Sequence, residues 1–447
     1  MTLSPLRLIA YSAPSLVTSV AALPMTLFVP AFYADDLGVP LATVGAAIGV
    51  SRLLDVVTDP LIGSLSDRLR LPFGRRKAWM ILGMPLFLVS LWKVFVPGEA
   101  ASASYLLVWS GLLYLGFTMI DLPHKAWGAE LSTDYDERSR VTSWRESIST
   151  AGQVMLLAGL VWLASRGIEN ASDQLHAIAL TIIVGLPLLL AFCVLCVDER
   201  EPEGHAHEPR STLAGFRIVG RNPAFLRMVG SVTFFVSGVA IQGTLHRLVL
   251  SDVMLDESRF PLMILLENLG TLLAIPAWLA ISTRIGKHRA LMAAALWISV
   301  WSLPLVFLRA GDTTMLIALI VVRGSSFASI LFLANSIAAD VIDVDTLESG
   351  EQRSGLFFAV WGMVIKLSLA LGVVLATTLP ALIGYEPSAD VTSPITQDRL
   401  MMVYGIVPAI LMGLGAMFLR DFPITRERHD EVRAEIEARR KLDSPLV

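Results

Sequence analysis

Residues 50–77 read VSRLLDVVTDPLIGSLSDRLRLPFGRRK, a run in which charged side chains stand inside an otherwise apolar stretch. Asp55 and Asp59 are four residues apart, so on a helix they share one face, and Arg52 lies near the same face. A charge at the centre of a bilayer costs about 2.5–3.5 kcal/mol on insertion scales. The stretch therefore indicates either a structural arginine–aspartate pair or a cation site. We expect the cation site, because ionisable residues inside membranes usually mark function.

The composition supports a membrane location for this stretch. The chain has 447 residues, of which 54% are hydrophobic and only 17% are charged, whereas soluble domains carry about 25% charged residues. The start, MTLSPLRLIAYSAPSLV, has no A-x-A-like cleavage site, so we expect no removable signal peptide. The sequence contains no G-x-x-x-x-G-K-[ST], G-x-S-x-G or H-E-x-x-H motif, which argues against an enzyme and against ATP-driven transport. Nothing in the sequence indicates nucleic-acid binding.

The hydropathy pattern predicts an all-α membrane protein with twelve transmembrane helices. We expect an N-terminal six-helix bundle over residues 1–197, a cytoplasmic linker over 198–222, a C-terminal six-helix bundle over 223–420 and a cytoplasmic tail over 421–447. The tail is charged and is expected to form a short surface helix. With spans of roughly 20 residues, the predicted helices cover about 8–33, 40–66, 78–96, 103–127, 141–164, 175–197, 226–250, 259–283, 289–308, 313–338, 356–382 and 399–419.

Basic residues in the connections predict the orientation of the chain. The loops after the even-numbered spans and the tail hold most of the lysines and arginines, as in the loop RLRLPFGRRK. Cytoplasmic loops carry this excess, so we expect both termini to be cytoplasmic in a multi-pass protein of the cell (inner) membrane.

The pattern R-x-x-D-x-x-x-D-P-x-x-G-x-x-x-D, followed by a basic loop ending in GRRK, resembles the glycoside–pentoside–hexuronide:cation symporters of the major facilitator superfamily. Three further segments match in the same order: TMIDLPHKAWGAEL, DERSRVTSWRESISTAG and ADVIDVDTLESGEQRSGLFFAVWGMVIK. The resemblance covers nearly the whole chain. It implies the major facilitator fold, with two six-helix halves that rock around a central site.

The resemblance implies a site for the coupling ion. Asp55 and Asp59 match the family's cation-binding carboxylates, and Thr118 matches a hydroxyl ligand on the fourth helix. Thr58 stands where the best-known sugar transporter of the family has an asparagine ligand, which keeps a hydroxyl but loses a carbonyl oxygen. Such a site can take Na+ through Asp55 and Asp59, or H+ alone, and both remain open. No other cofactor is expected.

The resemblance also implies substrate-binding residues. Asp121, Arg145 and Lys366 match the family's sugar-site aspartate, arginine and lysine, and Trp361 lies near the same depth as Lys366. Two positions depart from the pattern of the best-known sugar transporter: Ser19 replaces a second aspartate and Lys125 replaces a stacking tryptophan. Lys125 can instead extend to the membrane surface, and Trp361 can serve core packing.

Further charged residues have two interpretations each. Glu267 and Arg323 can pair inside the second half or line the substrate cavity. Pairs such as Asp67 with Arg75 and Asp340 with Arg353 are candidate gates on the inner side, with a solvated loop as the alternative.

Three functions are compatible with the sequence. The first is Na+- or H+-coupled symport of a small sugar- or glycoside-like solute by alternating access. The second is transport of an amphiphile such as a lysophospholipid, which Ser19 and Lys125 favour because a cation suits a phosphate or carboxylate headgroup. The third is a non-transporting receptor or assembly factor. The two buried carboxylates argue against it, because such a protein does not need them. The expected partners are the substrate and membrane lipids, and the protein is expected to be a monomer.

Overall fold

The computed structural model of the chain describes residues 3–69, 73–98, 101–168, 170–199, 220, 222–349, 354–384 and 394–443. These residues are helical and contain no β-strand. Eleven helices in the described part are long and apolar enough to cross a membrane. The helix Leu41–Arg68 (α3), which holds the charged stretch quoted above, joins them as the twelfth long membrane segment of the chain. The predicted all-α fold with twelve long helices is confirmed.

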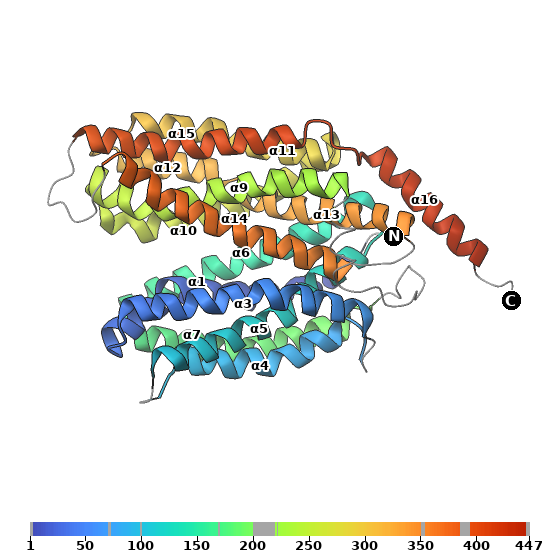
Figure 1. Cartoon of the computed structure of the whole chain (residues 1–447), viewed down its shortest axis with the longest axis horizontal. Helices are drawn as coiled ribbons and strands as arrows, with labels where there is room; N and C mark the ends of the chain where they lie inside the picture. Colours follow the sequence, from blue (N-terminus) through green and yellow to red (C-terminus); the bar gives the residue numbers. More distant parts are fainter. Residues whose placement is uncertain are drawn as a thin grey trace. The chain divides into compact units, whose positions relative to one another are not determined.

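The chain divides into two compact units (Figure 1). Unit 1 comprises Met1–Val219, Ile342–Met363 and Glu431–Val447. Within it, α4 packs on α5, α3 packs on α5, and α1 packs on both α6 and α7. Besides α3, its long helices are α1 (Pro5–Leu27), α4 (Lys77–Phe95), α5 (Ala103–Glu130), α6 (Tyr135–Ser165) and α7 (Ala171–Cys196).

Small residues allow the helices of unit 1 to approach closely. A Cβ added to Gly116 on α5 would lie 2.7 Å from the backbone nitrogen of Phe87 on α4. A Cβ added to Gly152 on α6 would lie 2.2 Å from the carbonyl oxygen of Leu16 on α1. Helix association in membranes depends on such contacts, because lipid supplies no hydrophobic driving force between helices. The glycines therefore fix the α4–α5 and α1–α6 pairs.

Unit 2 comprises Gly220–Val341 and Val364–Asp430. Within it, α9 and α11 both pack on α15, and α10 packs on α11 and α12. Its helices are α9 (Pro223–Leu248), α10 (Phe260–Ile285), α11 (Lys287–Ser302), α12 (Thr313–Gly324), the first part of α13 (Phe327–Ser349), the second part of α14 (Ser354–Leu382) and α15 (Pro394–Phe418). The predicted boundaries of the two six-helix halves remain a prediction.

The helix boundaries differ from the predicted spans at three places. The first span ends as an α-helix at Leu27 and continues through α2 (Val29–Ala31) and the π-helix η1 (Phe32–Asp36). The tenth span is broken between α12 and α13, and α13 continues to Ser349. The charged tail forms α16 (Arg426–Asp443), whose buried Val432 and Ile436 cluster with Leu347.

Candidate functional site

The predicted ion site is centred on the buried carboxylate of Asp59, whose side chain is 2% exposed on α3. Thr118 on α5 donates a hydrogen bond from Oγ1 to Asp59 Oδ1 over 2.8 Å. Thr58 Oγ1 is buried and has no hydrogen-bond partner among the described residues. Gly362 on α14 leaves room beside the carboxylate, since a Cβ there would lie 3.7 Å from Asp59 Oδ2. The side chain of Asp55 lies outside the described residues.

These side chains offer one carboxylate and two hydroxyls, and all of these ligand atoms are hard oxygens that suit an alkali or alkaline-earth cation. Thr118 and Asp59 are brought together from helices that the sequence separates by 59 residues. In the described part of the chain, no group of three or more His, Cys, Asp and Glu side chains can hold a metal ion.

Arg52 contacts a residue of α5. Its Nε donates to the hydroxyl of Tyr114 over 3.2 Å, and its guanidinium carbon lies 5.9 Å from the centre of the Tyr114 ring. The side chain is exposed at this position of α3. Tyr114 thus gives Arg52 a partner that the sequence interpretation, which considered only aspartates, did not include.

The predicted substrate residues of unit 1 form a charged cluster. Lys125 Nζ lies 2.6 Å from Asp121 Oδ2, one turn earlier on α5, and Arg145 Nη1 of α6 lies 3.6 Å from Asp121 Oδ1. Glu146 Oε2 lies 3.8 Å from Arg145 Nη2, so the cluster contains two cations and two carboxylates. Asp121 and Lys125 remain 20% and 24% exposed, so a ligand can reach them.

The other predicted substrate residues are placed differently. Ser19 Oγ donates to the carbonyl oxygen of Ser149 over 2.8 Å, so this hydroxyl takes part in the contact between α1 and α6. Trp361 is 2% exposed on the part of α14 that belongs to unit 1. Lys366 is half-buried on the part of α14 that belongs to unit 2.

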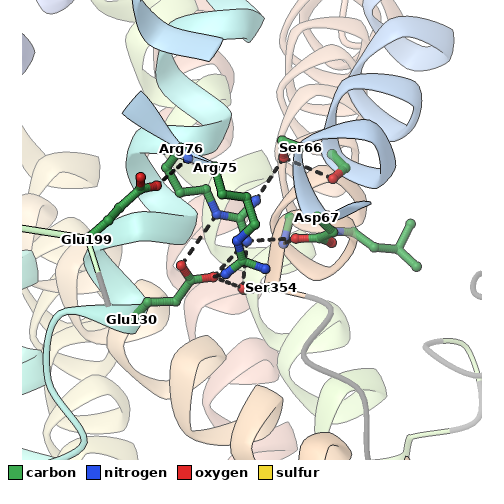
Figure 2. Close-up of polar contacts among 10 residues, drawn as sticks. Ser66, Asp67, Arg75, Arg76, Glu130, Glu199 and Ser354 are labelled. Carbon is green, nitrogen blue, oxygen red and sulfur yellow. Dashed lines mark hydrogen bonds and ion pairs between the residues drawn. The ribbon is translucent and has the colours of Figure 1, made fainter. Parts of the chain in front are cut away.

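The predicted pair of Asp67 with Arg75 is wrong (Figure 2). Asp67 pairs with Arg76, with 2.6 Å between Oδ1 and Nη2, and Arg75 Nη2 lies 2.9 Å from Glu130 Oε1. Phe73 and Gly74 precede these arginines with φ of 77° and 113°, a left-handed turn that determines where the following side chains point. Both arginines therefore contact Glu130, and Arg76 also pairs with Asp67.

We call this group of side chains the Arg76 network, which comprises Ser66, Asp67, Arg75, Arg76, Glu130, Glu199 and Ser354 (Figure 2). Arg76 is fully buried and donates to Ser66 Oγ over 2.8 Å and to Glu130 Oε1 over 2.6 Å. Glu199 accepts a hydrogen bond from the backbone N–H of Arg76. Burial opposes the charge, but Glu130 and Asp67 outweigh it and raise the pKa of Arg76 above its ordinary value.

Asp67 also caps the N-terminus of α14. Its carboxylate accepts from the backbone N–H of Gly355 over 2.8 Å and from that of Leu356 over 2.9 Å. A carboxylate at this position satisfies amides that have no partner inside the helix and is stabilised by the helix dipole. The sequence analysis missed this role because Asp67 and Gly355 are 288 residues apart.

Asp340 has a partner that the sequence analysis did not consider. Asp340 Oδ2 lies 2.6 Å from Lys287 Nζ in unit 2, and both side chains are at most 2% exposed. Arg353, the partner expected from the sequence, lies outside the described residues. In unit 1, Asp343 pairs with Arg138 of α6, with 2.6 Å between Oδ2 and Nη1. These aspartates near the end of α13 therefore have defined partners and are not solvated loop residues.

The predicted pairing of Glu267 with Arg323 is confirmed. Arg323 Nη2 donates to Glu267 Oε1 over 2.9 Å, and the two side chains lie on α10 and α12 of unit 2.

Comparison with known proteins agrees with this fold. Residues 10–426 match the family described as MFS/sugar transport protein. The putative glycoside/cation symporter YagG of Escherichia coli (strain K12) is 25% identical, over 92% of this chain and 90% of that protein. The sodium-dependent lysophosphatidylcholine symporter 1 of Homo sapiens is 23% identical, over 88% of this chain and 78% of that protein.

A solved structure shows the same fold at lower sequence identity. A bacterial homologue of the iron transporter ferroportin, in an outward-facing state, superposes with a TM-score of 0.68 at 14% identity over 93% of this chain and 99% of that chain. The family match covers most of the sequence and nearly all of its long helices. The chain therefore belongs to the MFS/sugar transport protein family of the major facilitator superfamily, whose members are multi-pass membrane transporters and not enzymes.

Proposed function

We propose that this protein is a secondary active transporter that couples the entry of a cation to symport of a small, sugar- or glycoside-like solute. The observation that carries the proposal is the buried Asp59 carboxylate with Thr118 bonded to it. The neighbouring residue along the helix, Thr58, adds a buried hydroxyl that has no hydrogen-bond partner among the described residues. A buried carboxylate is costly in a membrane, so its presence in a membrane helix indicates a function such as binding an ion. The name of the E. coli relative, a glycoside/cation symporter, agrees with this function.

Sodium is the ion that we propose for this site. The carboxylate of Asp59 and the hydroxyls of Thr58 and Thr118 are ligands for a hard cation, and Asp55 would add a second carboxylate from one turn earlier. A proton needs only a carboxylate and gives no reason for the Thr58 hydroxyl to be buried without a hydrogen-bond partner among the described residues. H+ coupling is the alternative, and the gradient experiment below distinguishes the two ions.

Asp121, Lys125 and Arg145 are the residues that we propose to contact the substrate, with Trp361, Lys366 and Ser19 as further candidates. Asp121 accepts hydrogen bonds and the two cations donate them, which is the combination that a solute with several hydroxyl groups can use. Transport would proceed by alternating access. Asp67, Arg75 and Asp340 are proposed gating residues whose ion pairs break when the transporter changes conformation, and Arg353 is a proposed partner outside the described residues.

Transport of a lysophospholipid is the second candidate. Lys125 supplies a cation for a phosphate group, and the human relative is named as a lysophosphatidylcholine symporter. We propose that the transporter acts as a monomer in the inner membrane with both termini in the cytoplasm, in accordance with its basic loops.

A ligand screen tests the proposal. The melting temperature of the purified protein is measured with neutral glycosides, hexuronides and lysophosphatidylcholine, each with and without Na+, because ligands that bind only the folded state raise it. The ligand found is then followed into liposomes under a Na+ or an H+ gradient. Asp59→Asn should abolish gradient-driven uptake, whereas Thr181→Val, which removes a hydroxyl bonded only within α7, should not. Undiminished gradient-driven uptake by the Asp59→Asn variant would refute the ion site.

A further inference from the structure

Unit 2 contains a buried polar cluster that the proposed ion and substrate sites do not use. It comprises Gln242 and His246 of α9, Glu267 of α10, Arg323 of α12 and Tyr404 of α15, and each side chain is at most 9% exposed. The Glu267 carboxylate has one hydrogen bond, from Arg323 Nη2 to Oε1. Its Oε2 lies 3.7 Å from His246 Nε2, which is longer than a hydrogen bond.

His246 lies between the Glu267 carboxylate and a tyrosine hydroxyl. The opposite ring nitrogen, Nδ1, lies 2.6 Å from the hydroxyl oxygen of Tyr404. Each ring nitrogen therefore faces a group that can exchange a proton with it. Histidine passes protons between its two nitrogens, and chains of acidic residues and histidine within membrane helices serve as proton relays.

Arg323 has a second contact that does not involve Glu267. Its guanidinium carbon lies 4.8 Å from the centre of the Phe327 ring, a cation–π contact. Arg323 Nε and Nη1 have no hydrogen-bond partner among the described residues, and neither has Gln242 Oε1. Leaving buried polar groups unpaired is unfavourable, so the cluster is incompletely satisfied in its present form.

The cluster also lies where helices are interrupted. The break between α12 and α13 begins after Gly324, one residue beyond Arg323, and the π-helix η2 (Val249–Val253) follows the end of α9 close to His246. Thr271 of α10 donates to the freed carbonyl oxygen of Gly324 over 2.7 Å. Broken membrane helices and π-turns are typical of ion and substrate sites in transporters.

We propose that Glu267, His246, Tyr404 and Arg323 form a proton-binding site in unit 2, with His246 as the relay between the Tyr404 hydroxyl and the Glu267 carboxylate. As a proton arrives from water on the Tyr404 oxygen, the hydroxyl passes its own proton to His246 Nδ1. The ring releases the proton on Nε2 to Glu267 Oε2. Tyr404 remains a phenol, His246 remains neutral in the other tautomer, and Glu267 becomes a neutral acid that has gained one proton.

Glu267 is the one carboxylate in this cluster of described residues. Gln242 and Tyr404 are neutral, and the Ser302 hydroxyl of α11 accepts a hydrogen bond from Gln242 Nε2. Arg323 acts electrostatically on both His246 and Tyr404, and Glu267 acts on Tyr404. Lys287, at the start of α11, is paired with Asp340.

Infrared spectroscopy of the full-length protein in liposomes, without Na+ or substrate, tests the proposal. The carbonyl stretch of a protonated carboxylic acid should appear as the pH is lowered, because Glu267 gains a proton at the proposed site. Glu267→Gln should remove this band, whereas Asp59→Asn and the exposed control Glu348→Gln should retain it. The result does not depend on ion coupling at Asp59, so the two proposals can fail separately.

The relay has its own test. In deuterated buffer the acid band shifts as its proton exchanges, and His246→Phe should slow this exchange by about 100-fold, as expected when a positioned proton-transfer group is lost. An unchanged exchange rate in this variant overturns the relay. An unchanged band in Glu267→Gln overturns the proton site. The absence of a titrating acid band in the wild-type protein also overturns it, and this result does not require any variant to fold.

Discussion

Removal of the Glu130 charge should destabilise unit 1 strongly. Glu130 is 6% exposed and lies 2.6 Å from Arg76 Nη2 and 2.9 Å from Arg75 Nη2. Glu130→Gln keeps the shape of the side chain but leaves two buried arginines with Asp67 as their remaining ion-paired carboxylate in Figure 2. Loss of one partner from a buried ion pair costs about 3–5 kcal/mol, a factor of more than about 100 in the unfolding equilibrium.

Equilibrium unfolding in mixed detergent micelles measures this loss through the fluorescence of the 10 tryptophans. The loss should persist in alkaline buffer, because the pKa of Arg76 is raised and the arginine stays charged. Glu348→Gln, a matched change at an exposed position of α13, should stay within about 0.5 kcal/mol of the wild type. A Glu130→Gln variant that is equally stable would refute the assignment of Arg76 as the centre of a buried charge network.

Three further variants test other parts of the structure. Gly63→Val should cost about 1–3 kcal/mol in the same unfolding assay, because a Cβ at Gly63 would lie 2.5 Å from the carbonyl oxygen of Gly355. Val432→Asp should release α16 from its contact with Leu347 and speed tryptic cleavage of the tail several-fold. Lys125→Ala should remove about 1.5–3 kcal/mol of binding energy for a ligand with a phosphate headgroup, measured as the loss of its thermal shift, while it spares neutral glycosides.

Each of these variants has a control in the same chain. Gly45→Val introduces the same side chain where nothing lies within 4 Å, and equal losses at Gly45 and Gly63 would contradict the close helix approach. Glu435→Gln alters an exposed position of α16 and should leave cleavage unchanged. Lys93→Ala removes a lysine that lies over the Trp109 ring, so an equal effect there would argue against a specific role of Lys125.

The fold could be predicted from the sequence because each long helix is an apolar run of membrane-spanning length. The break after Gly324 could not, since glycine and serine also occur within continuous membrane helices. The contact between Asp59 and Thr118 was predicted from the family resemblance. Sequence spacing could not predict it, because the two residues lie on different helices.

The partners of the charged residues were harder to predict. Arg75 and Arg76 are adjacent and chemically identical, and the sequence does not indicate that both contact Glu130 while Arg76 also pairs with Asp67. The pairing of Lys287 with Asp340 joins residues that are 53 positions apart, and only packing within unit 2 brings them together. Local sequence patterns do not contain this information.

The most direct test of the coupling-ion site compares the melting temperature of the full-length protein in NaCl with that in choline chloride. At a Na+ concentration 100 times the dissociation constant, binding to the folded state should contribute about 2.7 kcal/mol. The wild type and Thr181→Val should therefore melt at a higher temperature in NaCl, and the shift should disappear in Asp59→Asn and decrease in Thr118→Val. A Na+-dependent shift of full size in Asp59→Asn, or no shift in the wild type, would contradict a sodium site at Asp59.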